Sequence, residues 1–350
     1  MTEAIRVGLV GCGMAARVFH LPFLRQLPQF SVDAVLQRHA DDARTLLLQA
    51  RVVRELDALL DDPTIDLAVI TTPNGSHFDY ARRSLLADKH VVLEKPFTLT
   101  AAEAHELDLL AQQRKRVLSA HQNRRWDGDF LTVQRLLASG MLGRLVQYES
   151  HFDRYRPQPK PQAWRESVAE GGGVLFDLGT HLIDQAHSLF GAPRSVQAAV
   201  RCQRTGVQVD DRFSVTLHYD GLDVSLHAGM LIRAPTPRFA LYGTDGAYVK
   251  YGLDPQEEAL KAGAQPSGES WGKEAEAHWG RLTTTRHGLT LHAALETLPG
   301  NYLAYYQNIA EAISGTAGLI VTAAQATLTM RIVEAARLSA REERTVALAA

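Results

Sequence analysis

A glycine-rich turn near the N-terminus constrains the fold of this chain more than any other feature. The run Gly8-Leu9-Val10-Gly11-Cys12-Gly13-Met14-Ala15-Ala16 follows a short apolar segment and precedes an amphipathic one. Gly11 allows a tight turn, Gly13 allows the backbone to approach a pyrophosphate, and Ala16 is small enough for close packing of helix on strand. The helix N-terminus would then present N–H groups to the phosphates. A tight turn alone could explain two glycines, but in this context we expect a dinucleotide site.

Short apolar segments alternate with amphipathic ones through the first third of the chain. Strands are predicted at residues 5–10, 32–36, 67–71, 90–93 and 117–120. Helices are predicted at residues 15–27, 41–50, 55–60, 76–87 and 101–113. This alternation is typical of a parallel sheet with right-handed crossovers, so residues 1–123 are predicted to form a Rossmann-type, doubly wound NAD(P)-binding domain.

The pattern changes after about Gln122. A helix at 130–139 and a segment at 144–153 precede a Gly171-Gly172-Gly173 turn, which opens a helix that runs to residue 189. Alternating segments at 195–201, 212–219, 222–230, 238–242 and 248–251, several of them separated by Asp/Gly turns, favour antiparallel hairpins. Helices at 302–314 and 323–341 follow a predicted long surface loop at 261–288. Residues 124–350 are therefore predicted to be an α+β domain for substrate binding and oligomerisation, with a large, mostly antiparallel open sheet.

Composition excludes several classes of partner. The formal net charge is −2 with both signs interspersed, which gives neither a basic stripe for nucleic acid nor a polybasic membrane anchor. No apolar run approaches the roughly 18 residues that span a bilayer. The N-terminal Met1-Thr2-Glu3-Ala4 is not typical of a signal peptide, and two cysteines, Cys12 and Cys202, cannot form a disulfide framework. We therefore expect a cytoplasmic protein that acts on a small molecule.

The end of the second predicted strand indicates which nicotinamide cofactor is used. An acidic residue there would pair with the free ribose 2′-OH of NAD, but the strand ends in Gln37, followed by Arg38 and His39. A guanidinium can bind a 2′-phosphate through two hydrogen bonds, whereas a carboxylate would repel it. Asp41 and Asp42 come a few residues too late for the acidic position. A solvated Arg38 is the alternative, and NAD stays possible, but NADP is favoured.

Two further turns follow strands at the carboxyl edge of the parallel sheet, where ligands bind. Glu94-Lys95-Pro96 ends one strand, and we expect Lys95 to point into the crevice beside the nicotinamide. Thr71-Thr72-Pro73-Asn74 ends the neighbouring strand, with His77 in the following helix.

A polar stripe is predicted on the helix after the glycine turn. At 3.6 residues per turn, Asp177, His181 and Asp184 fall within about 60° of one another. Alcohol–carbonyl redox chemistry needs a group that moves the hydroxyl proton, and a histidine beside a carboxylate suits that task. A single histidine on such a helix is more often packed or solvated. A metal site of His181, Asp184 and His187 is disfavoured because His187 points away, so no metal is assigned.

Taken together, these motifs resemble those of the glucose–fructose oxidoreductase / inositol dehydrogenase (Gfo/Idh/MocA) family over nearly the whole chain. The residues that carry the resemblance are Gly-x-Gly-x-x-Ala, Thr-Pro-Asn with His77, Glu-Lys-Pro, and Gly-Gly-Gly followed by Asp-x-Gly-x-His-x-x-Asp. Segments 121–127, 148–157 and 249–257 look like the NADP-dependent scyllo-inositol dehydrogenase branch.

The resemblance implies an oxidoreductase that moves a hydride between NADP(H) and a secondary hydroxyl or carbonyl of a cyclic polyol or sugar. It implies a catalytic set of Lys95, Asp177 and His181, and a substrate pocket lined by Trp164, Arg165 and Asp184. It also implies a homodimer or homotetramer built through the open sheet. The expected cofactor contacts are Gly11, Gly13, Met14, Ala15, Gln37, Arg38, Thr72, Pro73, Asn74, His77, Glu94, Lys95 and Asn123.

Two alternatives stay open from the sequence. One is a non-catalytic regulatory protein of the same fold that senses NADP or sugar, although such a protein has no need to keep Lys95, Asp177 and His181 together. The other is a different reaction with a tightly held nicotinamide, such as NAD-assisted glycoside cleavage.

Overall fold

The computed structural model describes residues 3–40, 42–159 and 171–348, which form two compact units. The first unit contains Met1–Asn123, Gln256–Trp271 and Asn301–Thr327, and the second contains Arg124–Pro255, Gly272–Gly300 and Leu328–Ala350. The first unit therefore includes α8 (Gln256–Lys261) and α9 (Leu303–Ser314) besides the N-terminal third of the chain.

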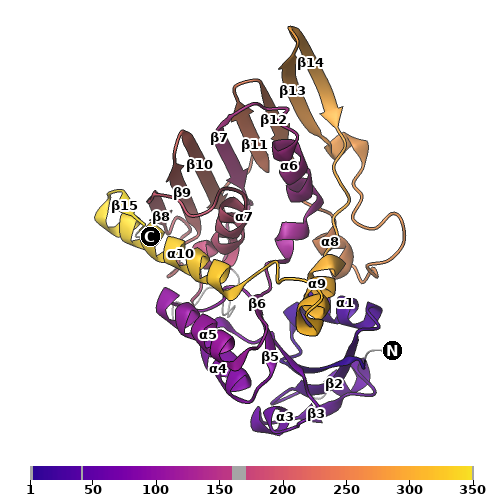
Figure 1. The fold of residues 1–350 in the computed structure, drawn as a ribbon. Helices are drawn as coiled ribbons and strands as arrows, with labels where there is room; N and C mark the ends of the chain where they lie inside the picture. Colours follow the sequence, from indigo (N-terminus) through magenta and orange to yellow (C-terminus); the bar gives the residue numbers. More distant parts are fainter. Residues whose placement is uncertain (1–2, 41, 160–170, 349–350) are drawn as a thin grey trace. The chain divides into compact units, whose positions relative to one another are not determined.

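The first unit is built on a parallel sheet of six strands in the order β3-β2-β1-β4-β5-β6. Figure 1 labels β2, β3, β5 and β6 of this sheet. The strands are β1 (Ile5–Val10), β2 (Phe30–Leu36), β3 (Arg51–Val53), β4 (Leu67–Ile70), β5 (His90–Leu93) and β6 (Leu118–Ala120). β4 is buried throughout, because helices cover both faces of such a sheet. The five predicted strands and the doubly wound class are confirmed. β3 was not predicted, since three residues are too few to show a period.

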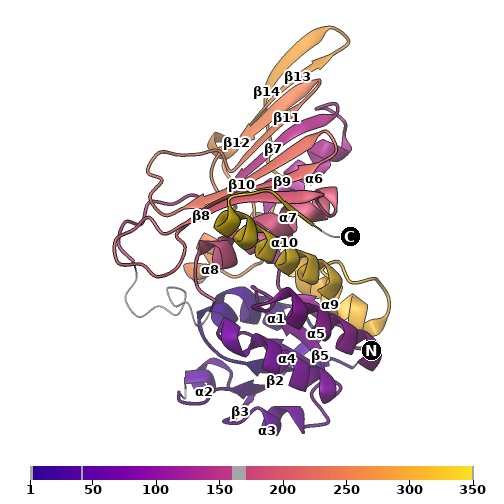
Figure 2. The same ribbon diagram turned by 90° about the vertical axis from the view of Figure 1, so that its left-hand side faces the viewer.

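The sequence pattern did not predict α8. The helices of the N-terminal third agree with the pattern except at the first one and at the second, which is shorter than predicted. They are α1 (Leu21–Gln26), α2 (Asp42–Leu46), α3 (Asp57–Leu60), α4 (His77–Leu86) and α5 (Ala101–Arg114), of which α4 and α5 lie side by side (Figure 2). The helix predicted at 15–27 begins as a π-helical turn, η1 (Ala16–His20), before α1. Pro22 has no N–H to donate, which interrupts regular hydrogen bonding at this junction.

The second unit contains a nine-stranded sheet in the order β14-β13-β12-β11-β7-β10-β9-β8-β15. β7 and β10 are parallel and the other neighbours are antiparallel, which confirms the predicted, mostly antiparallel sheet. The strands are β7 (Leu145–His151), β8 (Ser195–Arg201), β9 (Arg212–Tyr219), β10 (Leu222–Gly229), β11 (Phe239–Gly243), β12 (Gly246–Lys250), β13 (Gly280–Arg286), β14 (Leu289–Leu295) and β15 (Val346–Ala347).

The surface loop predicted at 261–288 was wrong over its second half. After a short helix, η6 (Glu276–His278), the chain forms β13, which pairs with β14 in a hairpin. His287 and Gly288 make the turn with φ of 51° and 76°, the geometry of a two-residue hairpin turn that Asn-Gly commonly provides. The hairpin was not predicted, because histidine is uncommon at the first position of such a turn and because Leu289 and Leu291 are exposed.

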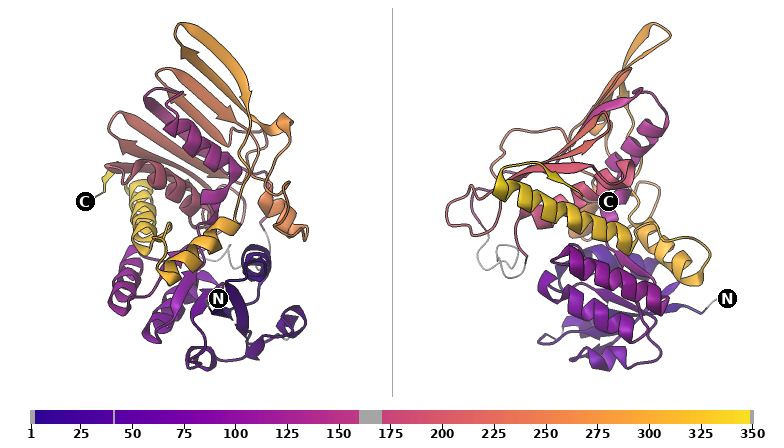
Figure 3. Two further views of the ribbon diagram at one scale, coloured as in Figure 1. Left: turned by 45° about the vertical axis from the view of Figure 1, so that its right-hand side comes forward. Right: turned by 60° about the vertical axis from the view of Figure 1, so that its left-hand side comes forward.

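Helices cover one face of the second sheet (Figure 3). Phe130 of α6 (Gly128–Ala138) contacts the ring of Phe239 on β11, and Phe190 of α7 (Thr180–Phe190) contacts Tyr148 on β7. The chain ends with the long helix α10 (Ala323–Glu342) before β15. Among the residues with described positions, no helix is long and apolar enough to cross a membrane.

Candidate active site

The glycine turn has the geometry that a dinucleotide requires. Gly11 has a φ of +96°, and its N–H donates to the Leu36 carbonyl at 3.1 Å, which holds the turn against the end of β2. A Cβ added at Gly13 would meet no protein atom within 4 Å, so a ligand group can approach the backbone there. These residues fit the pyrophosphate of a nicotinamide cofactor.

Guanidinium groups surround the end of β2. Arg38 is exposed, and Arg54 donates to the carbonyls of Gln37 and Ala40 at 2.6 Å each. Arg17 pairs with Asp42, and this contact, with a hydrogen bond from Gln37, lowers the pKa of the Asp42 carboxyl. Arg17 and Arg54 were not predicted to lie near the end of β2. Arg54 was not expected there because it follows β3, which was not predicted.

His77 joins the turns that follow β4 and β5. It is fully buried, with Nδ1 2.8 Å from the Pro96 carbonyl and Nε2 2.9 Å from the Thr72 carbonyl. Burial lowers the pKa of His77 despite these two carbonyls. The imidazole therefore holds Thr72, Pro73 and Asn74 beside the Glu94-Lys95-Pro96 turn, and its direct contact with a cofactor stays a prediction.

Lys95 is half-buried, and the preceding Glu94 is buried with both of its carboxylate oxygens hydrogen-bonded by protein. The donors are His20, His121 and the backbone N–H of Lys95. His20 and His121 were not predicted as site residues, since they lie far from Glu94 in sequence. The position of His121 directly after β6, at the ligand-binding edge, was the one available signal.

The helix that carries the predicted catalytic residues begins at a glycine that nothing larger could replace. Gly173 has a φ of +108°, and a Cβ there would lie 2.3 Å from Asp210 Oδ1. The Asp210 carboxylate accepts the Leu175 N–H at 2.7 Å and so caps the helix, while burial raises the pKa of Asp210.

The prediction of one regular α-helix from the glycine turn to residue 189 was wrong in its first turn. Residues Leu175–Gly179 form a π-helical turn, η5, and α7 begins at Thr180. The angles computed at 3.6 residues per turn therefore hold between His181 and Asp184 but not for Asp177. His181 is buried and Asp177 is half-buried. Single π-helical turns are rare and are frequent at functional sites.

The Asp184 carboxylate is paired with another side chain of the same unit. Its carboxylate accepts two hydrogen bonds of 2.7 Å from the guanidinium of Arg125, and both side chains are buried. Its role in a substrate pocket stays a prediction, and the predicted pocket residues Trp164 and Arg165 lie outside the described residues. Lys95 belongs to the first unit, whereas Asp177, His181 and Asp184 belong to the second.

Comparisons with known proteins agree with this organisation. Residues 5–122 match the model of the oxidoreductase family's NAD-binding Rossmann fold, and residues 134–348 match that of its C-terminal alpha/beta domain. The chain is 39% identical over 346 residues to scyllo-inositol 2-dehydrogenase (NADP(+)) IolW of Bacillus subtilis, covering 99% of this chain and 96% of the relative.

Two further relatives extend over whole chains. The oxidoreductase YdgJ of Escherichia coli is 43% identical over 349 residues, which is 100% of both chains. A solved structure of the oxidoreductase YvaA of Bacillus subtilis superposes with a TM-score of 0.95 and 38% identity, covering 99% of this chain and 100% of that one. The chain therefore belongs to the Gfo/Idh/MocA oxidoreductase family.

Proposed function

We propose that this protein is an NADP-dependent dehydrogenase that moves a hydride between the nicotinamide and a secondary hydroxyl or carbonyl of a cyclic polyol or sugar. A scyllo-inositol-like ring is the proposed substrate. The observation that carries this proposal is the similarity to IolW, which spans nearly the full length of both chains. Fold alone would not support a substrate, because one scaffold of this kind accepts many sugars.

The preference for NADP is supported by charge at the end of β2. Residues 37–40 contain no carboxylate, and Arg38 is exposed there beside the turn that Gly11 forms. Arg54 holds the carbonyls of Gln37 and Ala40 and so fixes the backbone on either side of Arg38. A guanidinium on a fixed loop can pair with a 2′-phosphate through two hydrogen bonds.

The bound nicotinamide supplies the hydride acceptor or donor. The proposed task of His181 is to take the hydroxyl proton during oxidation and return it during reduction, with Asp177 favouring the imidazolium. The proposed task of Lys95 is to hydrogen-bond the substrate oxygen and stabilise negative charge that develops on it. Gly11 and Gly13 bind the pyrophosphate through the backbone.

A panel of inositols and aldoses, each tested with NADP and NAD while nicotinamide absorbance is followed, tests this function. We expect NADP reduction with at least one cyclic polyol, and a higher kcat/KM with NADP than with NAD. Tight NADP binding without turnover on any polyol, sugar or ketone would favour the sensing protein. Nicotinamide that copurifies through extensive dialysis would favour a recycling cofactor.

A further inference from the structure

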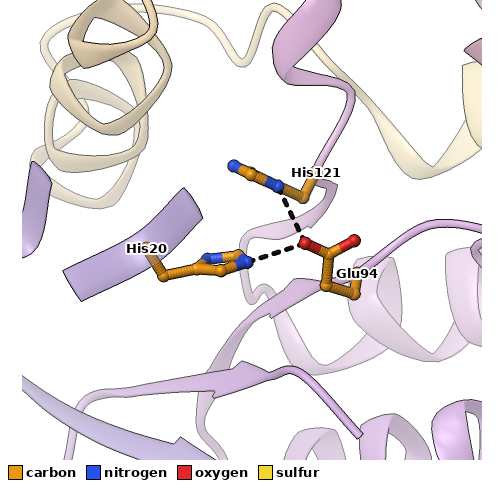
Figure 4. A group of neighbouring side chains, drawn as sticks. All are labelled: His20, Glu94 and His121. Atoms are coloured by element: carbon orange, nitrogen blue, oxygen red, sulfur yellow. Dashed lines mark hydrogen bonds and ion pairs between the residues drawn. The ribbon is translucent and has the colours of Figure 1, made fainter. Parts of the chain in front are cut away.

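A buried carboxylate in the first unit, that of Glu94, binds two imidazoles (Figure 4) and also the backbone N–H of Lys95. Glu94 Oε1 lies 2.9 Å from His20 Nε2 and 3.2 Å from His121 Nδ1. Glu94 Oε2 accepts the Lys95 N–H at 2.9 Å. His20 is fully buried, and Glu94 and His121 are 7% and 3% exposed. Each oxygen of this carboxylate thus has a protein donor, as a buried charge requires.

The hydrogen bonds of His20 determine which ring nitrogen carries its proton. Nδ1 lies 2.6 Å from the hydroxyl of Tyr306 on α9. Burial, with the neighbouring Tyr305 and Glu94, raises the pKa of Tyr306 well above its usual value, so the hydroxyl keeps its proton. The Glu94 carboxylate can only accept, so Nε2 must be the donor nitrogen of the neutral ring, and Nδ1 accepts from the Tyr306 hydroxyl. His20 Nε2 then carries the ring proton and donates it to Glu94.

Near neutral pH, Glu94 is ionised and His20 is neutral. Burial, assisted by His121, lowers the pKa of His20 to about 4, so its imidazole is neutral. Burial also opposes ionisation of Glu94, but the hydrogen bonds from His121 and His20 outweigh it and hold the pKa of the carboxyl well below its usual value. Glu94 is therefore a buried anion with three N–H donors.

These side chains come from segments that are distant in sequence. His20 ends η1 after the glycine turn, and Tyr306 comes from α9. His121 follows β6, and its N–H donates to the Leu93 carbonyl at 2.8 Å. Their common contact is the residue directly before Lys95, at the carboxyl end of β5.

We propose that Glu94, oriented by His20, His121 and Tyr306, is a positioning residue for Lys95. The inference rests on the proposed function, in which Lys95 contacts the substrate oxygen. By holding the Lys95 N–H, the carboxylate sets the point from which the lysine side chain extends. A displacement of about 1 Å in a reacting group can lower the rate roughly 100-fold, so the cluster acts on catalysis through Lys95.

His20, Glu94 and His121 could also be compared with a divalent-metal site, because one ligand atom of each lies within 4.8 Å of the others. Hydrogen bonding explains the geometry better. Both imidazoles lie within hydrogen-bond distance of the same carboxylate oxygen, and the Tyr306 hydroxyl is the partner of the other nitrogen of His20. A metal would have to displace both ring protons that Glu94 accepts.

Histidine side-chain ¹⁵N spectra test this arrangement without a substrate, with the His20 signals assigned by their loss in His20→Asn. We expect His20 to be the neutral Nε2–H tautomer between about pH 5.5 and 8.5, and equimolar ZnCl₂ to leave its signals unchanged. A His20 that titrates in this range, or the Nδ1–H tautomer, would overturn the proposal. Shifts of both His20 and His121 with ZnCl₂ would overturn it too and would identify a metal site.

Two adjacent tyrosines on α9 provide a matched pair of variants. Tyr306→Phe removes the hydroxyl that orients His20, whereas Tyr305→Phe removes a buried hydroxyl that lies 3.0 Å from Ser119 Oγ. We expect kcat to fall about 10-fold in Tyr306→Phe and about 100-fold in Glu94→Gln, with the Kd of NADP changed less than about threefold in Tyr306→Phe. Tyr305→Phe should keep its kcat. The proposal would be overturned if Glu94→Gln and Tyr306→Phe had the same kcat as Tyr305→Phe.

Lys95→Ala separates this inference from the proposed function. Normal turnover in Lys95→Ala would remove the catalytic role of Lys95, and the positioning role with it. An inactive Lys95→Ala beside a fully active Glu94→Gln would leave the proposed function intact and overturn the positioning role alone. If both roles hold, Glu94→Gln should add little to the loss in Lys95→Ala, because residues that act as a unit are not additive.

Discussion

The guanidinium of Arg125 holds the carboxylate of Asp184 through two hydrogen bonds of 2.7 Å, with both side chains buried in the second unit. Removing one partner of a buried pair leaves an uncompensated charge, which costs about 3–5 kcal/mol. We therefore expect Asp184→Asn to lower the free energy of unfolding by about that amount, measured by urea denaturation.

The pair of Arg194 and Asp220 gives the matched control, since both side chains are about 70% exposed. Asp220→Asn should cost less than about 1 kcal/mol, because water screens an exposed pair. Equal losses in the two variants would show that the Arg125–Asp184 pair is not the buried ion pair described here.

The sequence predicted most of the fold because burial follows simple periods. β1, β5, β8 and β9 have the predicted bounds, and the glycine turn lies where the motif placed it. The failures have physical reasons. β3 is too short to show alternation, and β13–β14 exposes Leu289 and Leu291, so its pattern does not distinguish a core face.

The candidate site was predictable only where a local motif encodes it. Gly11 and Gly13 lie in one turn of the chain, so a local motif is enough to predict them as cofactor-binding residues. His20 and His121 are brought to Glu94 by the sheet order, although they lie 74 and 27 positions from it in the sequence. Arg125 reaches Asp184 across 59 residues, and no spacing rule connects the two. The π-helical turn at η5 likewise cannot be read from hydrophobic spacing.

Buried histidines predict a loss of stability in mild acid. Burial is the main cause that lowers the pKa of His20 and of His187 from 6.5 to about 4. The unfolded chain takes up these protons near pH 6.5 while the folded chain does not, so the stabilisation is complete above pH 6.5 and declines as pH falls toward 4. Burial also lowers the pKa of His90, in the first unit, to about 4. We therefore expect a loss between pH 7.5 and 5.5 of about 2.5 kcal/mol in the first unit and about 1 kcal/mol in the second, measured by urea unfolding.

His187→Gln should remove the pH dependence that His187 contributes to the second unit. His39→Gln, at an exposed position, should leave the pH dependence unchanged. Stability that does not differ between the two pH values in the unaltered protein would contradict the neutral, buried state of these imidazoles.

Arg38 is expected to determine the cofactor preference. Arg38→Ala should weaken NADP binding by about 1.5–3 kcal/mol, as expected for a charge-assisted contact, and leave NAD binding nearly unchanged. Calorimetric titration with both cofactors measures the difference. Arg51→Ala is the control, because Arg51 lies on β3 of the same sheet and pairs with Asp62. Equal losses for NADP and NAD in Arg38→Ala would exclude a contact with the 2′-phosphate.

The open sheet of the second unit is expected to join subunits through the face opposite α6 and α7. Val215 and Leu217 point to the helix-covered face, so Thr216 lies on the other face, between Ser225 of β10 and Gln197 of β8. We expect sedimentation to give a homodimer or homotetramer at micromolar concentration, and Thr216→Arg to dissociate it. Asp220→Arg, at the β9–β10 turn, should not. A stable, active monomer of the unaltered protein would contradict this assembly.

The turnover of His181→Ala on the best polyol tests the catalytic account most directly. A positioned proton-transfer group contributes about 10²–10⁴-fold in rate, so kcat should fall by that factor while the Kd of NADP barely changes. His187→Gln, six positions along α7, should stay within a few-fold of the unaltered kcat. Lys95→Ala should act on the same step, and the double variant should lose less than the product of the single losses. Near-normal turnover in His181→Ala would contradict the account and would bring the non-catalytic, sensing function forward.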